Sequence, residues 1–144
     1  MLPIKNSTFF DTGVFRAVRP TGPLDTREEV DGAALETLFL QSLCAVNDYF
    51  ELGYGIHFWR TSAGHEVDFV LYGPRGLHAF EIKRASTIAN KDLRGLKAFK
   101  EDYPEATLHV LYGVKQREYP TTDFGAVTLI PFEMALRELP QIIG

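Results

Sequence analysis

The 144-residue sequence contains a single cysteine, Cys44, and has no long apolar run. One cysteine excludes an internal disulfide and any zinc site built from clustered cysteines. No stretch approaches the roughly eighteen apolar residues of a membrane-spanning helix, so we expect no membrane partner. Residues 1–10 carry one lysine and no continuous apolar segment, which does not resemble a secretory signal. These absences predict a cytoplasmic protein.

Positive charge is not in excess, because 15 Lys and Arg residues stand against 19 Asp and Glu residues, a formal net charge of -4. This balance argues against the broad cationic surface of a protein that binds duplex DNA tightly by counterion release. Any contact with nucleic acid is therefore expected to be local. The phosphate loop Gly-x-x-x-x-Gly-Lys-Ser/Thr is also missing, which places ATP hydrolysis outside these residues.

The composition is that of an ordinary globular protein, with 45% apolar and 24% charged residues, and predicts one domain over residues 1–144. The hydrophobic pattern predicts, in order, an N-terminal strand within 8–18, a loop over 19–25, a helix over 30–50, strands over 56–61, 65–72 and 77–84, a helix over 90–103, strands over 108–114 and 126–130, and a short helix from Pro131. The strand–helix–strand portion implies a parallel pair. We therefore expect an α/β fold with a central mixed β-sheet flanked by helices.

Charged residues interrupt two apolar strands that are joined by the turn Gly73-Pro74-Arg75-Gly76. Side chains two apart on a strand share a face, so Glu81 and Lys83 are predicted to point together. Asp68 is predicted to face away from its apolar neighbours Val67, Phe69 and Leu71, and the hairpin would bring it beside Glu81 and Lys83. The bulky residues Phe80 and Ile82 are predicted to enter the opposite apolar layer.

Two adjacent carboxylates, Asp68 and Glu81, suit a hard divalent cation such as Mg²⁺ or Mn²⁺, which takes oxygen ligands. Such an ion acidifies a bound water and polarises a phosphodiester. Lys83 would then orient that water, assist its deprotonation or stabilise the charge that develops on phosphorus. The competing interpretation is structural: Lys83 neutralises Glu81 or Asp68 in a buried ion pair.

Further candidate residues lie on the two predicted long helices. In the first helix, apolar residues recur at helical spacing at Ala34, Leu35, Leu38, Phe39, Val46 and Phe50. Glu36 lies along an apolar line of this helix and is a candidate third carboxylate for the metal. The second helix predicts a cationic face of Lys91, Arg94 and Lys97, which could contact phosphates beside a scissile bond. His65, three residues before Asp68, is expected at the rim of the same site.

Four segments together resemble one protein family: Phe9-Phe-Asp-Thr-Gly13, Gly32-Ala-Ala-Leu-Glu36, the stretch from Trp59 through Glu66-Val-Asp68-Phe-Val, and Phe80-Glu-Ile-Lys83. This family is the uncharacterised, nuclease-like C-terminal domain of prokaryotic AAA-type ATPases. The resemblance covers nearly the whole chain, and its Glu-Val-Asp-Phe and Glu-Ile-Lys blocks are the most specific parts.

The resemblance implies a restriction-endonuclease-like core of the PD-(D/E)XK superfamily. Asp68, Glu81 and Lys83 occupy its motif positions, and Glu36 occupies the helical acidic position. It also implies that the chain is a fragment or remnant of a larger ATPase. The leading hypothesis is a Mg²⁺- or Mn²⁺-dependent nuclease that hydrolyses phosphodiesters of DNA or another nucleic acid. The alternative is a non-catalytic interaction or sensor domain that serves an AAA-type ATPase.

Overall fold

The computed structural model describes the backbone of residues 7–11, 27–113 and 116–144, and the side chains of residues 32–113 and 116–144. The described elements, in chain order, are β1 (Ser7–Asp11), α2 (Arg27–Tyr49), β2 (Gly55–Thr61), β3 (Glu66–Gly73), β4 (Gly76–Lys83), the 3-10 helix η1 (Asn90–Leu93), α3 (Arg94–Asp102), β5 (Thr107–Tyr112), β6 (Thr121–Thr122), β7 (Gly125–Pro131) and α4 (Phe132–Ile143). The remainder of the predicted N-terminal strand, 12–18, and the predicted loop 19–25 lie outside these residues.

The described strands form one sheet in the order β1-β2-β3-β4-β5-β7-β6. The first four strands are antiparallel neighbours, whereas β4, β5 and β7 run parallel to one another. The short strand β6 pairs antiparallel with β7 at the far edge. The predicted mixed sheet is therefore confirmed, as is the parallel pair that encloses α3.

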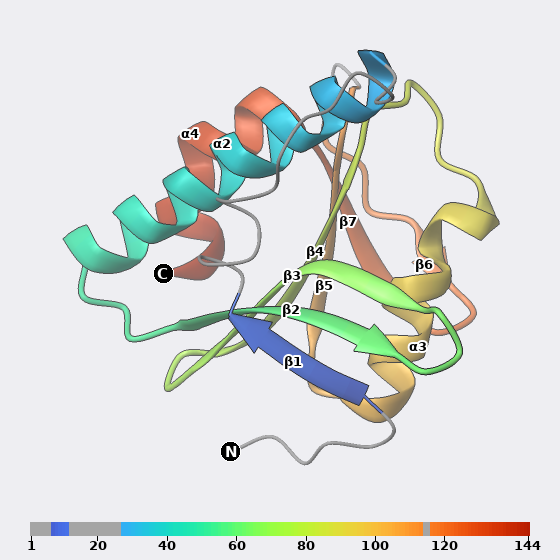
Figure 1. The fold of residues 1–144 in the computed structure, drawn as a ribbon, viewed down its shortest axis with the longest axis horizontal. Coiled ribbons are helices and arrows are strands. Elements are labelled where there is room, and N and C mark those ends of the chain that lie inside the picture. Colours follow the sequence, from blue (N-terminus) through green and yellow to red (C-terminus); the bar gives the residue numbers. More distant parts are fainter. Residues whose placement is uncertain (1–6, 12–26, 114–115) are drawn as a thin grey trace.

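Helices cover both faces of this sheet (Figure 1): α2 and α4 lie on one face and α3 lies on the other. Each face has its own buried core. The α2–α4 core includes Phe39, Leu43, Phe69, Phe80 and Leu139. The α3 core includes Trp59, Val67, Leu96, Phe99 and Val110. Within the described part of the chain, no helix has the length and apolar content needed to cross a membrane.

The buried stripe of α2 differs from the predicted one. Leu38 and Phe50 are 44% and 48% exposed, whereas Phe39 is fully buried. The ring of Phe39 lies 5.3 Å from that of Phe69 and 5.1 Å from that of Phe80, measured between centroids. Because these rings project from the centre of the sheet, they select which of two adjacent apolar stripes of α2 faces inward.

The predicted alternation along β3 is also wrong at one point, because the strand contains a bulge. Trp59 pairs with Val67 and His57 pairs with Val70, so two residues of β3 stand opposite the single residue Phe58. Val67 consequently packs in the α3 core, while Phe69 packs in the α2–α4 core. A bulge bends the strand and re-aims the side chains beside it. The two bulged residues are Asp68 and Phe69.

One C-terminal element differs from expectation. The strand β6 has no predicted counterpart, because two residues are too few to show an alternating pattern. The terminal helix begins directly after Pro131, as predicted, and its 12 residues continue through Pro140. Its buried residues Ala135, Leu139 and Ile143 recur every fourth position, and their packing outweighs the backbone hydrogen bond that proline cannot donate.

Substitution of Phe39 by alanine tests the inward stripe of α2. We expect Phe39→Ala to lower the free energy of unfolding by about 3–5 kcal/mol, because it leaves a cavity between α2 and the sheet. The matched control is Leu38→Ala on the same helix turn, which should cost less than about 1 kcal/mol. Urea denaturation measures both values, and equal losses would contradict the observed packing.

Candidate functional site

The end of β4 presents Glu81 and Lys83 on the α3 face of the sheet. Leu77 and Ala79, which precede them at two-residue spacing, pack in the α3 core. Phe80 lies in the α2–α4 core, and Ile82 packs against it. The predicted division of β4 into two faces is therefore confirmed. Glu81 is almost completely buried, with 7% of its surface exposed.

Asp68 reaches this strand end from the bulge of β3. The β3–β4 ladder ends with the pair of Phe69 and Phe80, so Asp68 and Glu81 stand at the next positions of the two strands. The Asp68 carboxylate is buried, and its Oδ2 accepts the backbone N–H of Ile82 at 2.9 Å. The structure thus brings Asp68 beside Glu81, as the hairpin predicts, although the bulge rather than strict alternation sets its direction.

Lys83 contacts Glu81 on one side only. Its Nζ lies 3.3 Å from Glu81 Oε1. The other carboxylate oxygen, Glu81 Oε2, is buried and has no hydrogen-bond partner among the described residues. A buried carboxylate oxygen without a partner is costly, so it marks either a strained position or a position that a ligand completes.

The charges of these three side chains are strongly coupled. Burial raises the pKa of Glu81 well above its ordinary value, and the Asp68 carboxylate raises it further, against the opposing effects of Lys83 and of a hydrogen bond from the Asp68 backbone N–H. For Lys83, burial acts to lower the pKa, but the Glu81 and Asp68 carboxylates together hold it above its ordinary value. Lys83 is therefore protonated at neutral pH, beside two carboxylates that repel each other.

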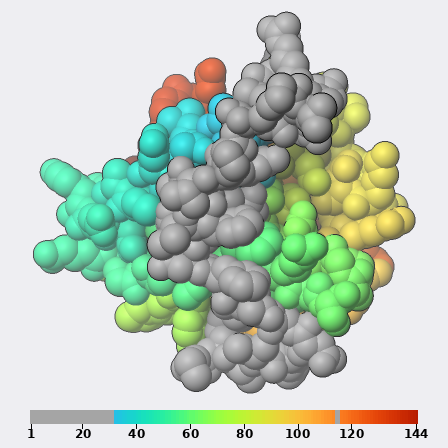
Figure 2. Space-filling model, viewed as in Figure 1, coloured from blue at the N-terminus to red at the C-terminus, as the bar shows by residue number. Residues whose placement is uncertain are grey.

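A pocket of about 330 Å³ opens next to this cluster. Three parts of the chain line it: the β2–β3 turn, the end of β4 and the η1–α3 segment, through His65, Glu66, Glu81, Lys83, Lys91, Asp92 and Arg94. The surfaces of the β2–β3 turn and of η1–α3 are adjacent in Figure 2. The expected position of His65 at the rim agrees with this lining.

Gly95 allows α3 to pack closely against β3 at this pocket. A Cβ atom at Gly95 would overlap the carbonyl oxygen of Glu66, so only glycine allows the helix to approach so closely. Asp92, on the preceding turn, accepts the backbone N–H of Ala89 at 2.9 Å through Oδ2 and also raises the pKa of Lys83. Sequence reasoning missed Asp92; its position directly before Leu93, the first buried residue of this helix, was the available signal.

Lys83 also lines a second pocket of about 360 Å³, which Leu35, Tyr112 and Phe132 help to form. Glu36 follows Leu35 and lies one helical turn before Phe39 and Leu40 on α2. It is half-buried. The structure therefore places Glu36 close in sequence to the lining of a Lys83 pocket. Among residues 32–113 and 116–144, however, no three His, Cys, Asp or Glu side chains form a group suited to a metal, so Glu36 does not complete such a set with Asp68 and Glu81.

The three predicted phosphate-contacting cations divide between two environments. Lys91 and Arg94 are exposed and line the pocket that contains Glu81. Lys97 does not line it, and its Nζ instead pairs with Asp123 Oδ2 at 3.0 Å. The sequence pattern predicts their shared exposure, but it does not reveal the partner of Lys97.

Residues 31–134 match the model of a family described as "Domain of unknown function (DUF4143)". The chain belongs to this family. The match includes α2, the β2–β4 strands and α3, and so contains Glu36, Asp68, Glu81 and Lys83. No curated protein and no solved structure matches the chain. Membership of DUF4143 identifies the domain without assigning it an activity.

Replacement of Glu81 by glutamine distinguishes a ligand position from a structural ion pair. The folded protein holds the Glu81 proton more tightly than the unfolded chain, whose pKa is near 4.5. The resulting stabilisation is full below that pH and is lost as the pH rises through the raised pKa. Glu81→Gln should therefore stabilise the metal-free protein at pH 8, by about 1 kcal/mol or more, and less at pH 5.

Urea denaturation in EDTA at the two pH values measures this difference. The control is Glu105→Gln, a substitution at an exposed glutamate, which should change stability by less than about 0.5 kcal/mol at both pH values. A Glu81→Gln protein that is destabilised equally at pH 5 and pH 8 would identify the Lys83–Glu81 contact as a stabilising ion pair and contradict the ligand interpretation.

Proposed function

We propose that this domain is a divalent-metal-dependent nuclease that hydrolyses phosphodiester bonds of DNA or another nucleic acid. The observation that carries the proposal is the Asp68–Glu81 pair. Two buried carboxylates lie side by side, and one oxygen of Glu81 has no partner in the described structure. Carboxylate pairs of this kind are stabilised by a cation between them.

Asp68 and Glu81 fit the ligand chemistry of Mg²⁺ or Mn²⁺. Magnesium is held by one or two carboxylates, with water and substrate phosphate as its other ligands, so two protein carboxylates suffice. When bound, the ion acidifies a water molecule and polarises the phosphodiester. The open pocket beside Glu81 leaves room for that phosphate. In this proposal Glu36 is an accessory acid that acts from α2 rather than a third direct ligand.

Lys83 is proposed to stabilise charge rather than to act as a base. Its Nζ lies 3.3 Å from Glu81 Oε1, and as an ammonium it can donate hydrogen bonds to the phosphoryl oxygens as negative charge develops. Lys83 lines both pockets at the end of β4, so a substrate in either one would meet its Nζ. Hydrolysis then transfers a hydroxyl to phosphorus and returns a proton to the departing sugar oxygen.

A second function is a non-catalytic interaction or sensor domain for an AAA-type ATPase. The Lys83–Glu81 contact of 3.3 Å and the net charge of -4 favour it. In this alternative the charged cluster is a structural remnant of the nuclease site. Cleavage of nucleic acid distinguishes the two functions. A nuclease cleaves nucleic acid and loses this activity when Asp68 loses its charge, whereas a non-catalytic domain cleaves nothing.

Cleavage of plasmid and single-stranded DNA with Mg²⁺ or Mn²⁺ tests the nuclease proposal. Asp68→Asn removes the charge but keeps an oxygen that can accept the Ile82 N–H, so the fold should survive. We expect Asp68→Asn and Lys83→Met each to lower the cleavage rate by about 100-fold or more. The matched control is Arg75→Gln, which removes an exposed cation from the β3–β4 turn, at the other end of β4 from Lys83, and should leave the rate of bond cleavage within about threefold at saturating DNA. Equal traces of activity in all variants would indicate a contaminating nuclease and refute the proposal.

A further inference from the structure

A larger groove of about 790 Å³ lies beside the Glu81 pocket. The η1–α3 segment forms one wall, and the β6–β7 hairpin forms the other. Lys91 and Arg94 line this groove as well as the Glu81 pocket, so the two hollows meet at these cations. Its volume falls within the roughly 300–1,000 Å³ of sites that enclose small organic ligands.

The side chains that line the groove carry one net positive charge, because Lys91, Arg94 and Lys97 stand against Glu118 and Asp123. Neither Lys91 nor Arg94 has an ion-pair partner within the described structure. By contrast, Asp123 of the β6–β7 turn is neutralised by Lys97 of α3, at 3.0 Å. This pair joins the two walls. The remaining acid, Glu118, hydrogen-bonds the side chain of Tyr112. Glu118 keeps its negative charge, but Lys91 and Arg94 have no ion-pair partner among the described residues and can meet an anion at the junction.

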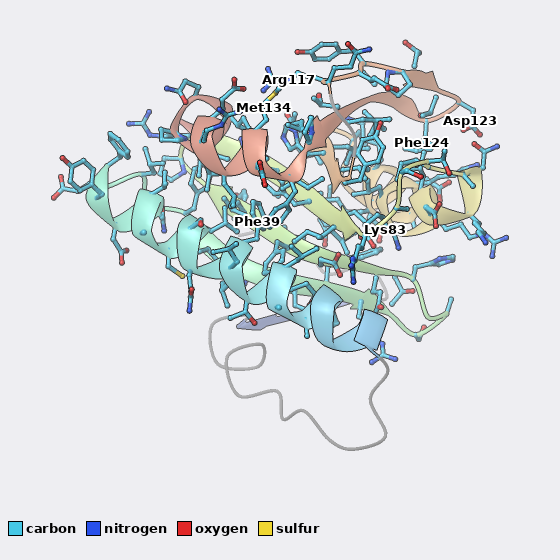
Figure 3. The ribbon with its side chains drawn as sticks, turned by 90° about the horizontal axis from the view of Figure 1, so that it is seen from above. Phe39, Lys83, Arg117, Asp123, Phe124 and Met134 are labelled. Atoms are coloured by element: carbon cyan, nitrogen blue, oxygen red, sulfur yellow. The ribbon has the colours of Figure 1, made fainter. Side chains whose placement is uncertain are left out.

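Apolar side chains line part of the groove, and one of them is an aromatic ring. They are Ile88, Leu129 and the half-buried Phe124, which packs against the α3 core. Thr122 fixes the turn that carries this ring: its hydroxyl donates to the Gly125 carbonyl at 2.6 Å and accepts the Phe124 N–H at 3.3 Å. In Figure 3, Phe124 and Asp123 lie over α3, on the same side of the molecule as Lys83.

We propose that this groove binds an unpaired nucleotide of single-stranded nucleic acid next to the scissile phosphate. The base packs against Phe124, and Lys91 and Arg94 hold the flanking phosphates. Aromatic side chains combined with local cations are the usual means of binding single strands, since every base has a stacking face. A base within a duplex is already stacked and paired, and the acidic chain lacks the cationic surface that would hold the duplex from outside. This inference rests on the proposed nuclease function and specifies its substrate.

The test is fluorescence anisotropy with a short labelled oligothymidine in EDTA, where no cleavage occurs. Phe124→Leu keeps an apolar side chain but removes the stacking ring, and should weaken binding about tenfold. Arg94→Gln should reduce the slope of log K against log salt by about 0.7, the value for one single-strand phosphate contact. The matched controls are Tyr49→Leu and Arg75→Gln, an exposed aromatic and an exposed arginine away from the groove, and neither should alter binding.

Three further ligands sharpen the outcome: the same strand in a duplex, its abasic counterpart and its RNA equivalent. Weaker binding of the duplex and of the abasic strand supports the inference, and the RNA strand shows whether both sugars are accepted. Equal or tighter binding of the duplex or the abasic strand overturns it, as does failure of the wild-type protein to bind any single strand. Binding is measured without cleavage, so the two proposals can fail separately. Single-strand binding in the groove by a protein that cleaves nothing would reject the nuclease function alone. Cleavage by the wild-type protein, together with unchanged single-strand affinity of Phe124→Leu and Arg94→Gln, would reject the groove alone.

Discussion

The arrangement of this site depends on the burial of two carboxylates at the ends of neighbouring strands. Asp68 is held in place because its carboxylate accepts the Ile82 N–H, and Glu81 is held by Lys83 on one of its two oxygens. The second Glu81 oxygen remains buried without a described partner. Such an arrangement stores an electrostatic cost in the folded protein, and costs of this kind are typical of functional sites. The rest of the site surrounds this pair.

The sheet makes this arrangement possible because one face packs against α2 and α4, while the other carries the site beside α3. The α2–α4 face packs around the three mutually close rings of Phe39, Phe69 and Phe80. The α3 face brings Lys91 and Arg94 next to Glu81, and Gly95 permits the close approach of that helix to β3. Parallel pairing of β4 with β5 leaves the carboxyl ends of both strands at the same edge, where α/β proteins commonly bind ligands.

Sequence patterns reveal the parts of this structure that follow local rules. Alternation along β4 predicts the shared face of Glu81 and Lys83, and helical spacing predicts the exposure of Lys91 and Arg94. The bulge at Asp68 could not be predicted, because it arises from pairing with β2 rather than from the sequence of β3. The inward stripe of α2, the short strand β6 and the Lys97–Asp123 pair likewise depend on contacts between distant segments.

The central claim is that Asp68 and Glu81 together bind a divalent metal. Electron paramagnetic resonance of free Mn²⁺ during titration measures this directly, without a nucleic-acid substrate. We expect one bound Mn²⁺ per wild-type chain, with affinity lowered about 100-fold or more in both Asp68→Asn and Glu81→Gln, because each variant loses a charged oxygen ligand. No binding by the wild-type protein, or unchanged binding by both variants, would contradict the claim.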